Sequence, residues 1–231
     1  CTLPAALADA AVCRGSFHAV LRTDVPDAVF SAFSAALQKA QADGSLLTAS
    51  LFRYENHLFF YAEGLNRPFT PQGLCPALDA ALLPWPPALG EAAPRPWAAM
   101  QPYFYHDVPT TAADWQQGRC PQRRRGRIAL LPPDSWCSYM EHHLRIVTEG
   151  LVEGDRWHLI CVQEGVLFSY LEEPRTNVNI KHQPGAHSPE LDAWIAADPE
   201  SHFARFTPEQ KAHPDSSHNF VFLPRIAGTE D

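Results

Sequence analysis

The sequence lacks three features that would each have assigned it to a class of protein. It has no apolar run long enough to cross a membrane. It has no surplus of positive charge, because 18 Lys and Arg residues stand against 26 Asp and Glu residues, which disfavours a general nucleic-acid binder. Its six cysteines form no CxxC pair and no histidine spacing typical of a zinc module. We therefore expect no metal, no nucleic-acid partner and no membrane partner.

The cysteines and the chain start bear on the compartment. Cys13, Cys137 and Cys161 stand in apolar contexts, as expected of small hydrophobic residues in a reducing environment. No signal peptide is recognisable. We therefore expect a cytoplasmic protein. Cys1 is interpreted as a trimmed chain end, with the first residue of a processed lipoprotein as the alternative.

One pattern of short apolar strands and amphipathic helices occurs twice along the chain. Three segments match in the same order, and they pair Arg14-Gly15 with Arg125-Gly126, 58–63 with 167–172, and 76–80 with 189–193. The pattern divides the chain into a 1–13 extension, a 14–108 first unit, a 109–126 linker, a 127–224 second unit and a 225–231 tail. The basic run of Arg123, Arg124, Arg125 and Arg127 is interpreted as solvated linker.

Each copy reads as strand, helix, strand, strand, helix, strand. The expected elements are 17–21, 26–42, 46–53, 57–62, 76–83 and 103–108 in the first copy, and 127–131, 134–151, 157–162, 166–171, 189–197 and 219–223 in the second. This order predicts an α+β fold of two ferredoxin-like units, each a four-stranded antiparallel sheet with helices on one face. Because the strands are apolar on both sides, we expect the sheets to pack together as an intramolecular pseudo-dimeric αβ-barrel.

The 134–151 helix carries the candidate catalytic residues. Asp134 is the expected N-cap. Tyr139 and His143 are four residues apart, so a hydroxyl and an imidazole project from one stripe of the helix. The alternative from spacing alone is that both are core residues, with the imidazole hydrogen-bonded to a neighbour.

The two copies differ in their polar content, which places any chemistry in the second. Eight of the eleven histidines fall there, scattered without a short ligand pair on one element. The 174–189 segment is long and polar and is expected to be either a binding loop or a surface excursion, and 207–217 is a second such loop.

On these residues the second copy resembles the L-rhamnose mutarotase family, whose members are small dimeric αβ-barrel proteins. The resemblance rests on the spacing of Tyr139, His143 and Ile146, on the 167–172 hairpin, and on 214–217 before the last strand. It covers 127–224. The family's Trp-Trp pair in the second helix is replaced here by His202-Phe203, and the loop before that helix is longer.

The resemblance implies an enzyme that interconverts the anomers of an aldose without a cofactor. His143 would move a proton at the anomeric centre, and Tyr139 would orient or protonate the second oxygen. The expected sugar-binding residues are Trp136, Trp194, His202, Phe203, Asp215, Ser216 and Asn179. The protein is expected to be a monomer with an internal pseudo-dimer, or a homodimer.

Two alternatives stay open at this point. The first is another αβ-barrel enzyme, either haem-binding and peroxidase-like, as in the chlorite dismutase group, or a cofactor-free monooxygenase. The second is a non-enzymatic sugar-binding or regulatory protein, since a fold does not fix a function.

Overall fold

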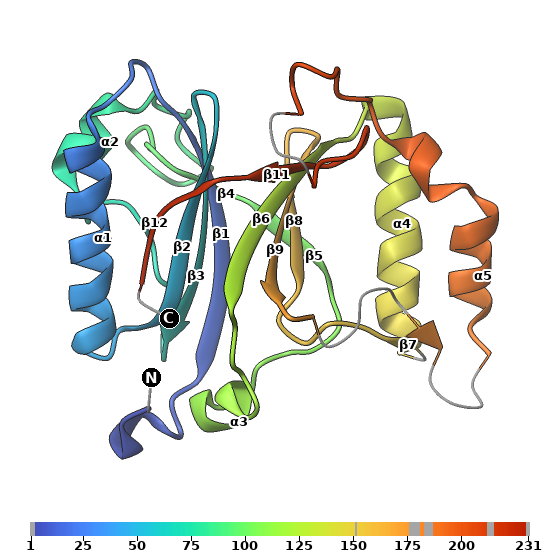
Figure 1. Ribbon diagram of the computed structural model, residues 1–231, viewed down its shortest axis with the longest axis horizontal. Coiled ribbons are helices and arrows are strands. Elements are labelled where there is room, and N and C mark those ends of the chain that lie inside the picture. Colours follow the sequence, from blue (N-terminus) through green and yellow to red (C-terminus); the bar gives the residue numbers. More distant parts are fainter. Residues whose placement is uncertain (1–2, 151, 176–180, 183–186, 212–214, 230–231) are drawn as a thin grey trace. The chain divides into compact units, whose positions relative to one another are not determined.

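The computed structural model describes residues 3–150, 152–175, 181–182, 187–211 and 215–229. The chain divides into two compact units, each with one five-stranded antiparallel sheet and its own helices (Figure 1). Unit 1 contains Cys1–Met100, Pro109–Pro121 and Pro224–Asp231, and unit 2 contains Gln101–Val108 and Gln122–Leu223. The fold is therefore mixed α+β.

Unit 1 is built on a sheet of strand order β12-β2-β3-β1-β4. Its elements are η1 (Ala5–Leu7), β1 (Val12–Val20), α1 (Asp27–Ala42), β2 (Leu46–Tyr54), β3 (His57–Leu65), α2 (Pro76–Ala81), β4 (Ala98–Ala99), α3 (Ala112–Gln116) and β12 (Arg225–Gly228). Helix α1 lies along one face of the sheet (Figure 1). Phe33 and Leu37 from α1 are fully buried against Phe60 and Leu51 from the sheet.

Unit 2 is built on a sheet of strand order β11-β6-β9-β8-β5. Its elements are β5 (Gln101–Tyr105), β6 (Arg123–Leu130), α4 (Pro133–Glu149), β7 (Val152–Glu153), β8 (Leu159–Gln163), β9 (Val166–Glu173), β10 (Lys181–His182), α5 (Pro189–Ala196), η2 (Pro199–His202) and β11 (Val221–Leu223). Helices α4 and α5 lie on one side of the sheet (Figure 1). No helix within the described residues has the length and apolar character needed to span a membrane.

Helix α4 matches the expected element but begins differently. Its N-cap is Pro132, no side chain caps it, and Pro133 occupies the first turn, where a missing N–H is tolerated. Asp134 lies in the first turn, so its predicted role as the cap is wrong. The helix ends at Gly150, whose φ of 67° is the left-handed conformation that glycine adopts without strain.

The turns of the central hairpins show which residues of the two units occupy equivalent positions. Glu55-Asn56 joins β2 to β3, and Glu164-Gly165 joins β8 to β9. The predicted match of 58–63 with 167–172 is therefore confirmed in position. The Arg-Gly match is wrong by one residue, because Arg14 lies opposite Glu63 whereas Arg124, not Arg125, lies opposite Glu172. A shift of one residue moves a side chain to the other face of the sheet.

The basic run is a strand, so its interpretation as solvated linker is wrong. Strand β6 begins at Arg123, four residues before the predicted start. Arg125 is only 9% exposed, and its guanidinium contacts Glu173 at 2.9 Å and Asp215 at 2.7 Å. The sequence could not show that Arg125 is paired, because its carboxylate partners are distant in the chain.

The outer strands also correct the predicted topology. The 103–108 segment was expected to close the first sheet, but β5 pairs with β8 in unit 2. Unit 1 has the short β4 beside β1, and β12 beside β2. Each sheet therefore has five strands rather than four. An apolar alternation predicts that a segment is a strand but carries no information about which strand it pairs with.

Candidate functional site

The shared register allows the helix-facing side of one sheet to be compared with that of the other. In unit 1, Phe17 of β1 lies opposite Phe60 of β3. In unit 2, the equivalent pair is Arg127 of β6 opposite Ser169 of β9. Two phenylalanines are thus replaced by a guanidinium and a hydroxyl.

The first helices of the two units differ in the same way. Buried positions of α1 include Phe33, Leu37 and Ala40, and those of α4 are Tyr139, His143 and Ile146, at the same spacing. This alignment equates Phe33 with Tyr139 and Leu37 with His143. Again two apolar residues of unit 1 correspond to polar residues of unit 2.

Unit 1 therefore serves as an internal reference for how this space is filled when only packing matters. Four apolar positions there correspond to Arg127, Tyr139, His143 and Ser169 in unit 2, and the last three are almost fully buried. Burying a polar group without a hydrogen bond costs roughly 1–3 kcal/mol. The chain places four polar side chains at positions where unit 1 shows that apolar residues fit, so we take the space between α4 and the sheet as the candidate functional site.

His143 is positioned as a neutral base. Its Nδ1 lies 2.9 Å from the backbone oxygen of Tyr139. A carbonyl oxygen only accepts, so Nδ1 carries the proton and donates it, and Nε2 has the free lone pair. Burial lowers the pKa of His143 from 6.5 to about 4, although the hydrogen bond to Tyr139 acts in the opposite direction. The imidazole is therefore uncharged at neutral pH.

Four aromatic rings surround His143. The ring centroid distances are 4.2 Å to Tyr139, 4.7 Å to Phe104, 4.7 Å to Trp194 and 5.6 Å to Tyr103. These contacts fix the orientation of the imidazole and exclude water from it.

Arg127 supplies positive charge in the same space. Its guanidinium lies over the ring of Phe220, 4.3 Å from the centroid, and its Nε is buried without a hydrogen-bond partner among the described residues. Burial lowers the pKa of Arg127 to about 10, and the hydroxyls of Tyr139 and Tyr103 act against this shift. The guanidinium stays charged at neutral pH and has donor capacity left for a ligand.

The two tyrosine hydroxyls near Arg127 stay protonated. Burial raises the pKa of Tyr139 to about 12 and that of Tyr103 well above its usual value. The hydroxyl of Tyr103 is buried beside that of Tyr139, and the interaction between the two hydroxyls contributes to the raised pKa of Tyr103.

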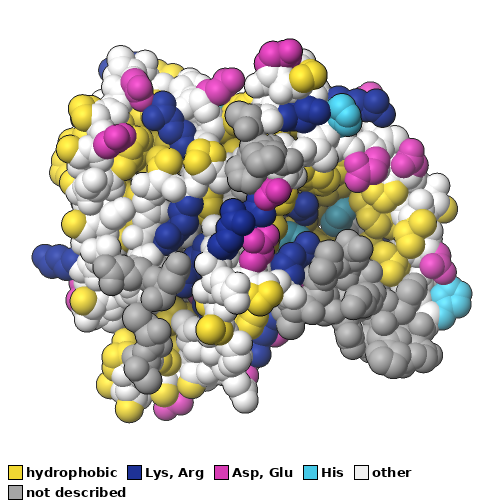
Figure 2. All heavy atoms as spheres, viewed as in Figure 1, with side chains coloured by type: hydrophobic (Ala, Val, Ile, Leu, Met, Phe, Trp, Pro, Cys, Tyr) yellow, Lys and Arg dark blue, Asp and Glu magenta, His cyan; other side chains and the backbone are white. Residues whose placement is uncertain are grey.

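The site is visible at the surface of the unit. Figure 2 shows a hollow between the sheet and α4 of unit 2, with hydrophobic side chains around it and His and Lys or Arg side chains at its floor. The hollow places an apolar wall beside positive charge and imidazole. Such a lining suits a flat, largely apolar ligand with one acidic group.

Five of the residues predicted for the site come together. Besides Tyr139, His143 and Trp194, these are His202 and Phe203, whose ring centroids lie 6.0 Å and 5.2 Å from that of Tyr139. The Nε2 of His202 also lies 3.3 Å from the hydroxyl of Ser138. These residues form the helix-side wall of the site.

For three other predicted residues, the structure shows exposure or contacts outside this cluster. Trp136 is 41% exposed on α4. The carboxylate of Asp215 binds Arg125, and the hydroxyl of Ser216 accepts a hydrogen bond from the backbone N–H of Phe222 at 3.0 Å. Asn179 lies outside the described residues.

Sequence reasoning missed Arg127, Tyr103 and Ser169. Arg127 was interpreted as part of the solvated basic run, and Tyr103 was interpreted as part of a strand of the first unit. The signal for Ser169 was present in the matched hairpins, where Leu58-Phe59-Phe60-Tyr61 corresponds to Leu167-Phe168-Ser169-Tyr170. A serine at a helix-facing position of an otherwise apolar strand was the available indication.

The buried imidazole predicts a specific pH dependence of stability. Because the pKa of His143 is about 4 in the folded chain and near 6.5 when exposed, the unfolded chain binds a proton first as the pH falls. The contribution of the neutral imidazole to the unfolding free energy is complete above pH 6.5 and is lost as the pH approaches 4. Between pH 7 and pH 4 the wild type should lose about 3 kcal/mol more unfolding free energy than His143→Leu. Urea unfolding of both proteins at a series of pH values measures this, and parallel curves would contradict it.

No group of three or more His, Cys, Asp or Glu side chains that could hold a metal ion is found where the structure describes the chain.

No family model matches the chain, and no curated protein matches it. Among solved structures, the chain is similar to a putative monooxygenase from Fusobacterium nucleatum, with a TM-score of 0.42, 8% identity, and 95% of this chain and 94% of that chain covered. It is also similar to an anthrone oxidase-like protein, with a TM-score of 0.36, 7% identity, and 94% and 95% covered. A putative monooxygenase from Lactobacillus acidophilus gives a TM-score of 0.34, 7% identity, and 95% and 96% covered.

Proposed function

We propose that unit 2 is an enzyme that removes a proton from a flat, weakly acidic aromatic substrate, of phenol or anthrone type, and delivers the resulting anion to dioxygen. The observation that carries the proposal is the combination of a neutral imidazole and a buried guanidinium inside an aromatic pocket. The imidazole contacts the rings of Tyr103 and Tyr139, and the guanidinium interacts with the hydroxyls of the same two tyrosines. A base and a fixed positive charge in one pocket are the groups that proton abstraction requires.

Each residue has a role in this reaction. Nε2 of His143 takes the acidic proton of the bound substrate. Arg127, whose Nε is buried without a hydrogen-bond partner among the described residues, stabilises the developing oxyanion. Trp194 and Phe203 contact the edges and faces of the substrate rings.

Dioxygen is the expected co-substrate because an electron-rich carbanion or phenolate can transfer electrons to it directly. For an anthrone, the ring methylene and one dioxygen molecule give a ring carbonyl and one water molecule. The two hydrogens of the methylene leave as that water. The apolar lining of the pocket suits a small apolar molecule such as dioxygen.

A mutarotase is the second candidate, as the family resemblance implies. The observation that favours it is the direct contact of the Tyr139 and His143 rings, at a centroid distance of 4.2 Å. A sugar also requires several hydrogen-bonding partners. Asp215 and Ser216, expected to bind its hydroxyls, are engaged by Arg125 and by the backbone of Phe222.

One set of assays separates these candidates from a protein that only binds. Oxygen uptake and product absorbance with anthrone test the first, and saturation-transfer NMR of anomer exchange with L-rhamnose tests the second. We expect oxygen consumption that depends on the protein and on anthrone. Anomer exchange above the buffer rate without oxygen uptake would favour the mutarotase, and saturable binding without either reaction would favour a binding protein.

We also propose that the two sheets pack against each other, as their two-sided apolar character predicts. The two units should then tumble together in solution. Backbone 15N relaxation should give one rotational correlation time for β1–β3 and for β6, β8 and β9. Separate correlation times for the two units would contradict this arrangement.

A further inference from the structure

A carboxylate is held in a fixed position beside the site, on the short helix η2. Glu200 lies in the first turn of η2 and is exposed to solvent. The side-chain amide of Asn219, which is only 5% exposed, donates a hydrogen bond to the Glu200 carboxylate and another, of 3.4 Å, to the backbone oxygen of Glu200. An exposed glutamate otherwise keeps its rotamer freedom. The buried amide therefore restricts where this negative charge stands.

The residue after Asn219 connects this carboxylate to Arg127. The ring of Phe220 lies beneath the guanidinium of Arg127, with 4.3 Å between the guanidinium carbon and the ring centroid. Burial is the largest influence on the pKa of Arg127 and on that of Tyr139, and the negative charge of Glu200 acts to raise both. Because such an interaction weakens with distance, the carboxylate faces the same space as these two side chains.

Arg127 and Glu200 nevertheless do not touch. No described carboxylate forms an ion pair with Arg127, and its Nε has no hydrogen-bond partner among the described residues. The guanidinium of Arg175 also acts on Arg127, but it is itself paired with Asp155 at 3.4 Å. The charges of Arg127 and Glu200 therefore offset each other across a gap, which leaves donors of Arg127 for a ligand.

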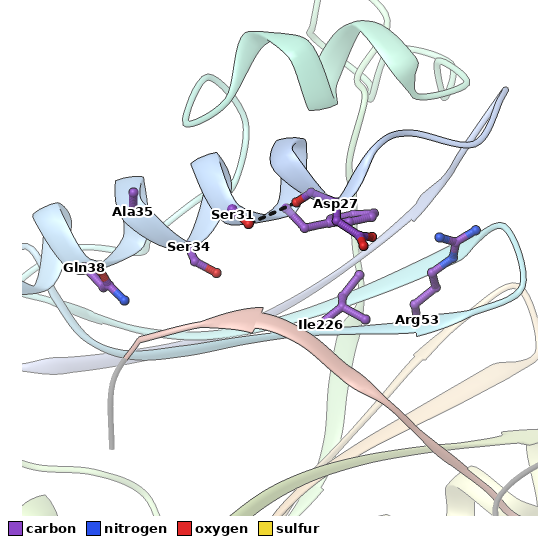
Figure 3. A pocket seen from close by; sticks show the side chains of 8 residues that line it. Asp27, Ser31, Ser34, Ala35, Gln38, Arg53 and Ile226 are labelled. Atoms are coloured by element: carbon purple, nitrogen blue, oxygen red, sulfur yellow. Dashed lines mark hydrogen bonds between the residues drawn. The ribbon is translucent and has the colours of Figure 1, made fainter.

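Unit 1 shows the ordinary way in which an arginine beside a groove is neutralised. Figure 3 shows Arg53 and Asp27 lining the groove between α1 and β12. Arg53 donates hydrogen bonds to the carboxylate of Asp24 at 2.8 Å and to the backbone oxygen of Glu55 at 2.6 Å. The chain itself engages this guanidinium by direct contact. Arg127 differs, because its compensating carboxylate is kept at a distance.

We infer that Glu200 sets the specificity of the site by excluding aromatic molecules that already carry a negative charge in solution. This inference rests on the proposed function and narrows its substrate class to flat aromatic molecules that are uncharged until His143 removes a proton. Without Glu200, Arg127 would attract any aromatic carboxylate, sulfonate or phenolate. With Glu200 in place, such an anion meets a negative as well as a positive charge, so its desolvation is not compensated.

The test compares two ligands of the same shape and different charge, 2-naphthoate and 2-naphthamide, by isothermal titration calorimetry. Neither carries an acidic C–H or hydroxyl group, so binding is read without turnover. Glu200→Gln keeps an oxygen that accepts from Asn219 and removes only the charge. The wild type should bind the amide more tightly than the carboxylate. In the variant, the affinity for 2-naphthoate should rise about 3–30-fold and that for the amide should change less than about 2-fold.

Ionic strength gives a readout that a structural role would not move. Glu200 is exposed, so added salt should screen its charge and shrink the difference between the variant and the wild type. The matched control is Asp27→Asn, which removes the same charge from the groove of unit 1. It should leave both affinities unchanged.

Unchanged 2-naphthoate binding in Glu200→Gln, or equal changes for both ligands, would overturn the inference. An equal rise in Asp27→Asn would also overturn it, because net charge alone would then explain the effect. A wild type that binds neither ligand would overturn both this inference and the proposed function. A wild type that shows the expected charge preference but does not oxidise anthrone would contradict the proposed function alone.

Discussion

His143→Leu should abolish most of the activity without unfolding the protein. Removing the proposed base should lower kcat by about 10²–10⁴-fold. Leucine is the residue at the equivalent position of unit 1, Leu37, where it is fully buried. The unfolding free energy at pH 7 should therefore stay within about 1 kcal/mol of the wild type, since one hydrogen bond is exchanged for apolar packing.

The result is measured by anthrone oxidation and by urea unfolding of the same preparations. Leu37→His is the matched reverse change, because it places a buried imidazole in the unit that has no cluster. It should be destabilised by roughly 1–3 kcal/mol and should keep full activity. A His143→Leu protein that is active but clearly less stable would show that His143 is a core residue.

Arg127→Met is expected to produce a similarly large loss of activity, by removing the positive charge that stabilises the anion. Loss of one such group lowers kcat by about 10²–10³-fold. The unfolding free energy should rise by about 1–2 kcal/mol, because a buried charge with an unpaired Nε is replaced by an apolar side chain. Steady-state kinetics and urea unfolding measure the two effects.

The control for Arg127 is another arginine of the same unit. Arg145 lies on the outer face of α4, its side chain is 55% exposed, and it pairs with Glu141 at 2.6 Å. Arg145→Met should leave both the stability and kcat nearly unaltered. Equal losses of activity in both variants would mean that net charge, rather than the position of Arg127, matters.

Most of the fold was accessible from the sequence because it depends on local patterns. The helices at α1 and α4 and the hairpins around Glu55-Asn56 and Glu164-Gly165 follow from apolar periodicity and turn residues. The partners of the edge strands could not be predicted, because tertiary packing decides that β5 pairs with β8 and that β12 pairs with β2. The Arg-Gly match was wrong for the same reason. The two Arg-Gly pairs look alike in sequence, but strand pairing places them one residue apart.

The candidate site was only half accessible. Tyr139 and His143 were found because helical spacing places them on one face. Arg127 could not be assigned, since four nearby arginines look alike in the sequence while only the fold shows which one faces α4. The comparison of unit 1 with unit 2 became informative once equivalent residues were assigned from strand pairing rather than from similar sequence.

The most direct test of the central claim is deprotonation itself, measured without oxygen. Exchange of the anthrone methylene protons for deuterium, followed by 1H NMR in D2O under argon, reports proton removal alone. The wild type should accelerate this exchange well above buffer, and His143→Leu should reduce it by about 10²-fold or more while remaining folded. Equal exchange rates in the two proteins, or no acceleration by the wild type, would contradict the assignment of His143 as the base.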